Sequence, residues 1–190
     1  RRSSDLFYID GSLVDIVPVY KYLGIQFSSS GSFYCTQKTL AHQARKALQC
    51  VKMELKNFYN LPLSVTLHIF DVKILPIMLY GCEVWGFHPS HNVVNVYDRF
   101  FKSVLHLSRS TPNIVARGEL GRSSVKVHQF VKIVKYWLRL TVRENNVILK
   151  QVYNYQHKLA SSDICCWALD VKNLLYRYGF GQVWLDQGVC

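Results

Sequence analysis

Histidine and cysteine side chains that could hold a metal ion are scattered along this chain. The seven histidines include one close pair, His88 and His91, but Pro89 lies between them and no third ligand follows. The six cysteines lack the paired spacing of a zinc site. The sequence also lacks the Gly-x-Ser-x-Gly motif of hydrolases and the Gly-x-x-x-x-Gly-Lys-Ser/Thr phosphate loop. We therefore expect no catalytic residue, no metal site and no small-molecule substrate in this chain.

Basic side chains form the pattern with the clearest chemical use. Residues 31–160 hold eighteen basic and six acidic side chains, so the formal net charge of +11 is concentrated there. Between residues 38 and 59, cationic side chains recur on one face of a predicted helix, at Lys38, His42, Arg45, Lys52 and Lys56. A helix turn rises about 5.4 Å, so a row of this kind can follow a phosphate backbone. The alternative is a basic face that is only solvated.

A second basic surface is predicted on residues 125–142, where we take Lys132 and Arg139 as further contacts for nucleic acid. Aromatic residues lie between the cations, at Tyr20, Tyr22, Phe27, Tyr34 and Tyr59. Aromatic faces can stack on bases while cations hold the backbone, a combination that suits RNA. For each aromatic residue, a place in the core is the alternative.

The first thirty residues predict a short β ribbon. Asp10-Gly11 between two apolar stretches is a strong hairpin signal, because a tight hairpin turn needs positive φ angles. After Pro18, the alternation from Tyr20 to Phe27 predicts one further strand. We therefore expect a mainly α fold in which a short N-terminal β ribbon precedes a multi-helix bundle.

Helical periodicity accounts for the rest of the chain. It predicts helices over residues 38–59, 63–86 (kinked near residues 72–73 by Pro76), 90–107, 125–142, 148–159 and 161–178, with a short helix after Pro112. Glu83 is expected to pair with Arg99 or Lys102. The predicted inner face of the 148–159 helix is Ile148, Val152, Tyr155 and Leu159, and Trp184 has no evident partner. The cysteines are expected to be reduced and partly buried, which favours an intracellular protein, nuclear or cytoplasmic and not secreted.

Several segments follow one another in an order known from one family of enzymes. The two most specific are residues 19–25 (VYKYLGI) and 74–86 (ILPIMLYGCEVWG); the others are residues 110–113, 118–122, 136–140 and the stretch from Trp167 to Trp184. Together they resemble the region C-terminal to the polymerase palm in reverse transcriptases of non-LTR (LINE-like) retrotransposons. The resemblance implies a palm-edge ribbon in residues 1–30, a thumb-like bundle in 31–110 and a helical linker in 111–190, with the parent protein extending past both ends.

The resemblance also implies roles for particular residues. Tyr22, Leu23 and Gly24 match the turn that grips the primer end, although an ordinary strand bend is the alternative. The 38–59 helix is similar to the thumb helix that lies along the template-primer duplex. The catalytic aspartates of the family are missing, and no Asp-Asp pair occurs in the chain. We therefore expect this chain alone to be inactive as a polymerase and to need no cofactor, since magnesium would bind in the absent palm.

The expected partners are RNA, an RNA–DNA duplex and the missing palm and fingers of the parent protein, but no membrane. The longest apolar run, Ile74 to Tyr80, is too short to span a bilayer. Two alternatives to a template-primer clamp stay open. One is a helical protein-interaction module retained by a host, and the other is a transposon remnant without a function.

Overall fold

The computed structural model describes residues 8–54, 61–142 and 147–188. The protein is mainly helical, with short β hairpins near its N-terminus, as the sequence predicted. It divides into two compact units, Arg1–Thr36 and Gln37–Cys190. A further division at residue 110 stays a prediction.

The first unit contains two β hairpins. In the first, β1 (Tyr8–Ile9) pairs with β2 (Ser12–Leu13), and Asp10 and Gly11 have φ angles of 49° and 77°, which confirms the predicted turn. In the second, β3 (Val19–Tyr22) pairs antiparallel with β4 (Ile25–Ser28). The prediction of one strand from Tyr20 to Phe27 was therefore wrong. The chain reverses at Leu23 and Gly24, whose φ angles of 46° and 85° suit a tight two-residue turn.

Thr36 joins the second hairpin to the helix that follows. Its buried hydroxyl accepts a hydrogen bond from the Gln26 amide (2.8 Å) and donates one to the Gln26 carbonyl (2.9 Å). The rings of Phe27 and Phe33 meet edge to face, 5.7 Å between centroids. These contacts fix strand β4 against the start of α1 (Tyr34–Glu54) within this unit.

Helix α1 continues into the second unit and buries a narrow apolar side, Leu40, Ala41 and Ala44. The sequence predicted a later start and end, and its residues 55–59 lie outside the described part of the chain. Gln37 holds the first turn in place. Its buried amide group donates to the His88 carbonyl at 3.0 Å and accepts from the Ser90 amide, so both ends of the side chain are bonded.

The predicted helix over residues 63–86 is divided into four parts. These are α2 (Leu63–Ile69), the π-helical turn η2 (Phe70–Ile74), α3 (Leu75–Met78) and, after the positive-φ Gly81, α4 (Cys82–Trp85). The π-helical turn η2 coincides with the kink predicted near residues 72–73. Pro76 has no amide hydrogen to donate to Val72, and a π turn is a common way to accommodate that loss.

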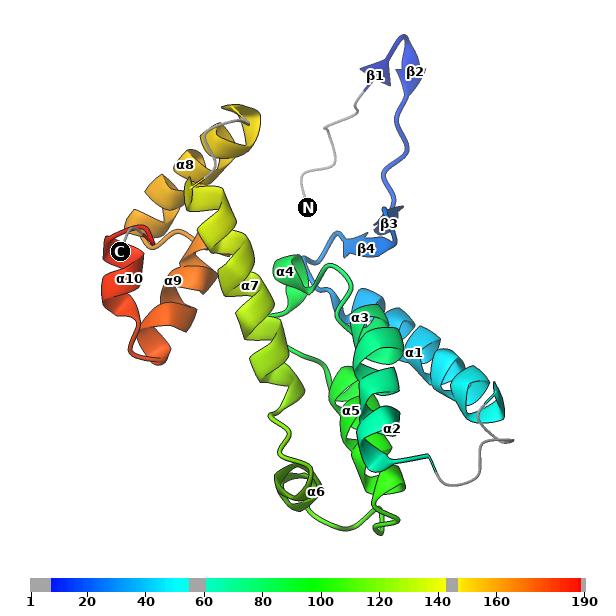
Figure 1. The fold of residues 1–190 in the computed structure, drawn as a ribbon. Helices are drawn as coiled ribbons and strands as arrows, with labels where there is room; N and C mark the ends of the chain where they lie inside the picture. Colours follow the sequence, from blue (N-terminus) through cyan, green and yellow to red (C-terminus); the bar gives the residue numbers. More distant parts are fainter. Residues whose placement is uncertain (1–7, 55–60, 143–146, 189–190) are drawn as a thin grey trace. The chain divides into compact units, whose positions relative to one another are not determined.

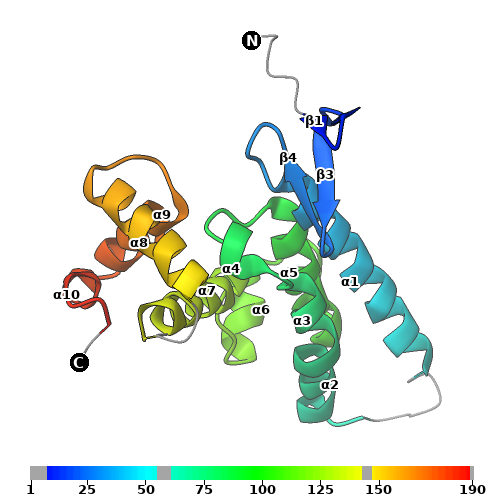
Figure 2. The same cartoon turned by 90° about the horizontal axis from the view of Figure 1, so that it is seen from above.

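Helix α5 (His91–Val104) packs against this divided helix. The rings of Phe70 and Phe100 stack with centroids 4.1 Å apart, and Tyr97 and Phe101 complete the buried aromatic group. Ser90 precedes α5 at the N-cap position, but its side chain makes no capping bond. Figures 1 and 2 show α5 beside the α2–α3 segment and α1. The chain continues through α6 (Asn113–Glu119) to α7 (Val125–Val142), whose bounds match the prediction.

Three further helices pack on α7 as a second core: α8 (Val147–Ser161), α9 (Trp167–Arg177) and α10 (Gly181–Leu185). The predicted inner face of α8 was wrong at three of its four residues, since Ile148 is 74% exposed and Val152 and Tyr155 are also exposed, whereas Leu159 is partly buried. Tyr153 and Ala160 are buried instead. The predicted start of the last helix was wrong too. The segment 161–163 ends α8, with Asp163 at φ 53°, and α9 begins after Cys166.

Both C-terminal tryptophans have partners. Trp184 is 5% exposed and stacks on Trp137 with ring centroids 5.7 Å apart, so the expectation that it lacked a partner was wrong. Trp167 packs edge to face against Phe87 and Tyr136. The short helix α10 explains the difference, because it returns residue 184 to the core that α7 and α9 form.

Candidate nucleic-acid interface

Helix α1 displays the predicted cationic face. Lys38, His42, Arg45 and Lys52 are all exposed, and the helix contains no acidic residue before Glu54. None of these four side chains forms an ion pair with a described residue. Lys56, the fifth predicted cation, lies outside the described residues. Lys46 is exposed on the same helix but was not predicted as a contact. It follows Arg45 directly, so it does not fit the helical spacing of the predicted row.

The Tyr22-Leu23-Gly24 segment forms the exposed tip of the second hairpin. Leu23 is 71% exposed and has a positive φ, a conformation that side-chain sterics disfavour. Tyr22 lies opposite Ile25 and Tyr20 opposite Phe27, so these four side chains share one face of the ribbon. The tip belongs to the Arg1–Thr36 unit and the remainder of the predicted contacts to the second unit.

The two predicted contacts on α7 are partly engaged within the protein. Lys132 Nζ lies 4.0 Å from Glu83 Oε1, and the Arg139 guanidinium lies over the Tyr136 ring, 5.8 Å from its centroid. Glu83 thus pairs with Lys132, and the prediction of Arg99 or Lys102 as its partner was wrong. The break after Gly81 places Glu83 on α4, which packs on α7. Figures 1 and 2 show α5 and the α2–α3 segment between α7 and α1, so the structure does not bring the α7 cations to the α1 face.

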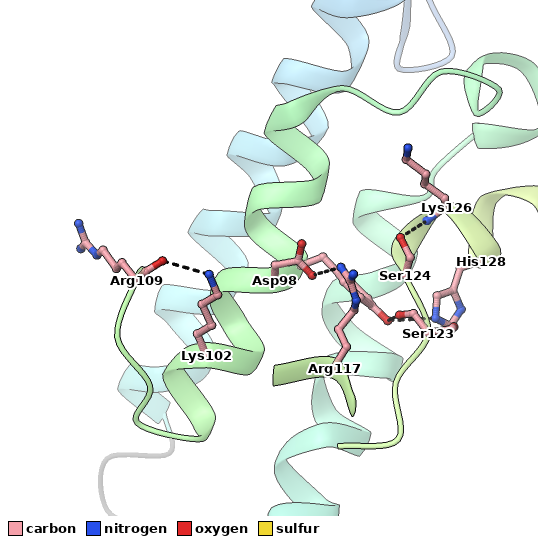
Figure 3. A network of polar contacts seen from close by, with 9 residues as sticks. Asp98, Lys102, Arg109, Arg117, Ser123, Ser124, Lys126 and His128 are labelled. Carbon is pink, nitrogen blue, oxygen red and sulfur yellow. Dashed lines mark hydrogen bonds and ion pairs between the residues drawn. The ribbon is translucent and has the colours of Figure 1, made fainter. Parts of the chain in front are cut away.

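Two other arginines neutralise acids inside the second unit. Arg117 bonds the buried Asp98 at 2.8 Å, as Figure 3 shows, and one Arg122 nitrogen lies 2.9 and 2.7 Å from the two Asp71 oxygens. Burial raises the pKa of Asp98, while the hydrogen bond and charge of Arg117 act in the opposite direction. Arg122 lies in residues 118–122, one of the segments that resemble non-LTR reverse transcriptases. Its contact is structural, since it joins the π turn to the segment before α7.

A basic cavity opens beside the end of α1. Its volume is about 630 Å³, and its lining comes from α1, α5, the loop after α5 and the start of α6: Lys52, Asn95, Asp98, Arg99, Lys102, Ser103, Leu107, Arg109 and Asn113. Lys102 Nζ donates to the Arg109 carbonyl at 3.0 Å (Figure 3), and Lys52 Nζ donates to Ser103 Oγ at 3.4 Å. The sequence did not predict this cavity, because the cavity depends on the loop after α5 returning to that helix.

The cysteines differ from one another in exposure. Cys35, Cys50 and Cys165 are exposed, so the expectation that they are partly buried was wrong, and Cys82 is buried. Burial, with a smaller contribution from Glu83, raises the pKa of Cys82 to about 12. Within residues 8–54, 61–142 and 147–188, no three His, Cys, Asp or Glu side chains group as metal ligands. Over the same ranges, every helix is too short or too polar to cross a bilayer.

Comparisons of this sequence and structure with protein-family models, curated proteins and solved structures find no match. The relation to non-LTR reverse transcriptases therefore stays a resemblance carried by the motifs. The candidate features of the second unit are the exposed cations of α1 and the basic cavity, and that of the first unit is the hairpin tip.

Proposed function

We propose that this chain binds nucleic acid along α1 and acts as a non-catalytic clamp for RNA-containing duplex. The observation that carries the proposal is the row of exposed cations at Lys38, His42, Arg45 and Lys52, on a helix without a competing acid before Glu54. Cations without ion-pair partners are available to neutralise phosphates, and each one that does so releases a counterion.

The resemblance to a reverse-transcriptase thumb favours an RNA–DNA hybrid over duplex DNA. A hybrid is A-like, and proteins bind its wide minor groove through sugars and phosphates, with little dependence on base sequence. The exposed tip at Tyr22, Leu23 and Gly24 supports a second contact, because strained backbone is often found where a protein holds a ligand. In the proposed parent enzyme, the α1 face would hold the duplex and this tip would hold the primer end.

A salt titration tests the proposal. Binding of a labelled RNA–DNA duplex to the full 190-residue chain would be measured at several salt concentrations, beside a DNA duplex of the same sequence. We expect tighter binding to the hybrid and a steep loss of affinity with salt. Lys38→Gln and Arg45→Gln should each lower the slope of log affinity against log salt by about one unit.

Lys158→Gln serves as the matched control. Lys158 is an exposed cation on α8, so this variant removes the same charge away from α1. Its slope should equal that of the wild type. Equal slopes for wild type, Lys38→Gln and Arg45→Gln would exclude α1 as the binding face, and a folded chain that binds neither duplex would exclude the proposed function.

One observation favours the alternative of a protein-interaction module. Ile148, Val152 and Tyr155 recur at helical spacing on α8, yet all three are exposed. Apolar residues grouped on a surface often mark contacts with a protein partner. This alternative would be supported by two results together. The wild-type chain would be folded, bind no nucleic acid and elute from size-exclusion chromatography as an oligomer, and the Val152→Ser variant would elute as a monomer.

A further inference from the structure

The basic cavity beside the end of α1 has the composition of an anion site. Four cations line it, at Lys52, Arg99, Lys102 and Arg109, and Leu107 is the one apolar residue of its lining. Its volume of about 630 Å³ falls in the range of ligand-binding pockets, about 300–1,000 Å³. Drug-like ligands prefer mostly apolar pockets, so the lining favours a polar, negatively charged ligand.

The cavity keeps a net positive charge, because one acid faces its four cations. The lone carboxylate in its lining is Asp98, and one oxygen of that group is bonded to Arg117. The described ion pairs of the protein include none of the four cations of the lining. Asn95 and Asn113 add amide donors. The cavity therefore presents an excess of hydrogen-bond donors and of positive charge.

Two hydrogen bonds position the cationic groups. Lys102 Nζ is held by the Arg109 carbonyl, which draws the loop after α5 toward that helix (Figure 3). Lys52 Nζ is held by Ser103 Oγ. The side chains of Arg99 and Arg109 have no described partner. Two arginines that are free to form bidentate bonds, beside two positioned lysines, suit phosphate oxygens.

Lys52 belongs both to the α1 face and to the cavity. A strand that follows Lys38, His42 and Arg45 along α1 reaches the cavity at this residue. We propose that the cavity binds phosphate groups, and that these belong to the backbone of the strand that follows α1. The assignment of the strand rests on the proposed function, whereas the phosphate chemistry rests on the lining alone.

Arg99→Gln and Arg109→Gln test this proposal in the full chain. Both arginine side chains are exposed, and neither makes a described hydrogen bond or ion pair that the substitution would remove. The ligands are the labelled RNA–DNA duplex and, in separate titrations, inorganic tripolyphosphate. We expect each variant to lower the salt slope for the duplex by about one unit and the double variant to lower it by about two. Tripolyphosphate should compete with the duplex for the wild type, and its own binding should be lost in the double variant.

The two proposals can fail separately. If Lys38→Gln and Arg45→Gln weaken duplex binding while the cavity variants and the Lys158→Gln control do not, the α1 face stands and the cavity proposal is overturned. If the chain binds tripolyphosphate in the cavity but no nucleic acid, the ligand is a free polyphosphate, which overturns both the assignment to a strand and the proposed function.

Discussion

The indole of Trp167 donates a hydrogen bond to the backbone carbonyl of Glu83, with 2.8 Å between Nε1 and O. The two residues are 84 positions apart. They lie in two of the segments that resemble reverse transcriptases, Glu83 in residues 74–86 and Trp167 at the start of residues 167–184. The Glu83 side chain also lies near Lys132 of α7, so one residue contacts both α7 and α9. These contacts attach the short α4 to the C-terminal helices.

Replacement of Trp167 by phenylalanine should weaken this attachment. The variant keeps an aromatic ring beside Phe87 and Tyr136 but removes the donor to Glu83. A hydrogen bond of this kind contributes about 0.5–1.5 kcal/mol to stability. We expect the free energy of unfolding, measured by urea denaturation, to fall by about that amount. An unchanged value would show that the contact contributes no stability.

Tyr153 should matter more, because its hydroxyl is buried and makes two hydrogen bonds. It accepts one from Trp137 Nε1 at 2.8 Å and donates one to Gln187 Oε1 at 2.6 Å. Tyr153→Phe leaves the buried Trp137 indole without an acceptor, at a cost of about 1–3 kcal/mol in the free energy of unfolding. Tyr155→Phe on the same helix is the control, since Tyr155 is 64% exposed and its loss should change stability by less than about 0.5 kcal/mol. Similar effects of the two variants would contradict the burial described here.

Helix α8 shows what periodicity can and cannot predict. Its existence and approximate bounds follow from the sequence, but two of its faces carry apolar residues at helical spacing. One contains Ile148, Val152 and Tyr155, and the other contains Leu149, Tyr153 and Ala160. The second is buried because the Tyr153 hydroxyl meets the Trp137 indole, which is a long-range pairing that no local pattern specifies. For α8, the bounds were therefore easier to predict than the identity of the inner face.

The parts of the candidate site also differ in how well the sequence predicts them. The cationic row on α1 depends on the period of a single helix, and all its described members are exposed as predicted. The basic cavity instead combines α1, α5 and a loop, so sequence spacing alone does not reveal it. Sequence also did not show which cations are neutralised, because Arg117 and Arg122 find their acids, Asp98 and Asp71, on other elements.

Cysteine reactivity should follow exposure. Alkylation by iodoacetamide needs the thiolate, and the pKa of about 12 together with complete burial keeps Cys82 in the unreactive thiol form. We expect mass spectrometry of the native chain to find alkylation at Cys35, Cys50 and Cys165, which are exposed, and none at Cys82. Urea should then make Cys82 reactive. Equal labelling of Cys82 and Cys35 in the native chain would contradict the packing around α4.

The last prediction concerns His128, which joins α7 to α5 through Tyr97. The Tyr97 hydroxyl donates its single proton to the Ser123 carbonyl at 3.0 Å, so His128 Nε2, 3.1 Å from the same hydroxyl, must carry a hydrogen and donate it. Figure 3 shows His128 beside Ser123. Burial lowers the pKa of His128 from 6.5, with a smaller and opposite effect from Asp71.

A lowered pKa means that the unfolded chain takes up this proton at a higher pH than the folded chain does. The contribution of His128 to stability is therefore complete above pH 6.5, and it is lost as the pH falls through the folded-state pKa. His128→Gln keeps a donor for Tyr97 but cannot titrate. We expect the difference in unfolding free energy between wild type and this variant to shift against the wild type as the pH falls from about 8 to about 5. A difference that stays constant over that range would show that His128 is solvated like an ordinary surface histidine, and would remove the neutral Tyr97–His128 contact from the core.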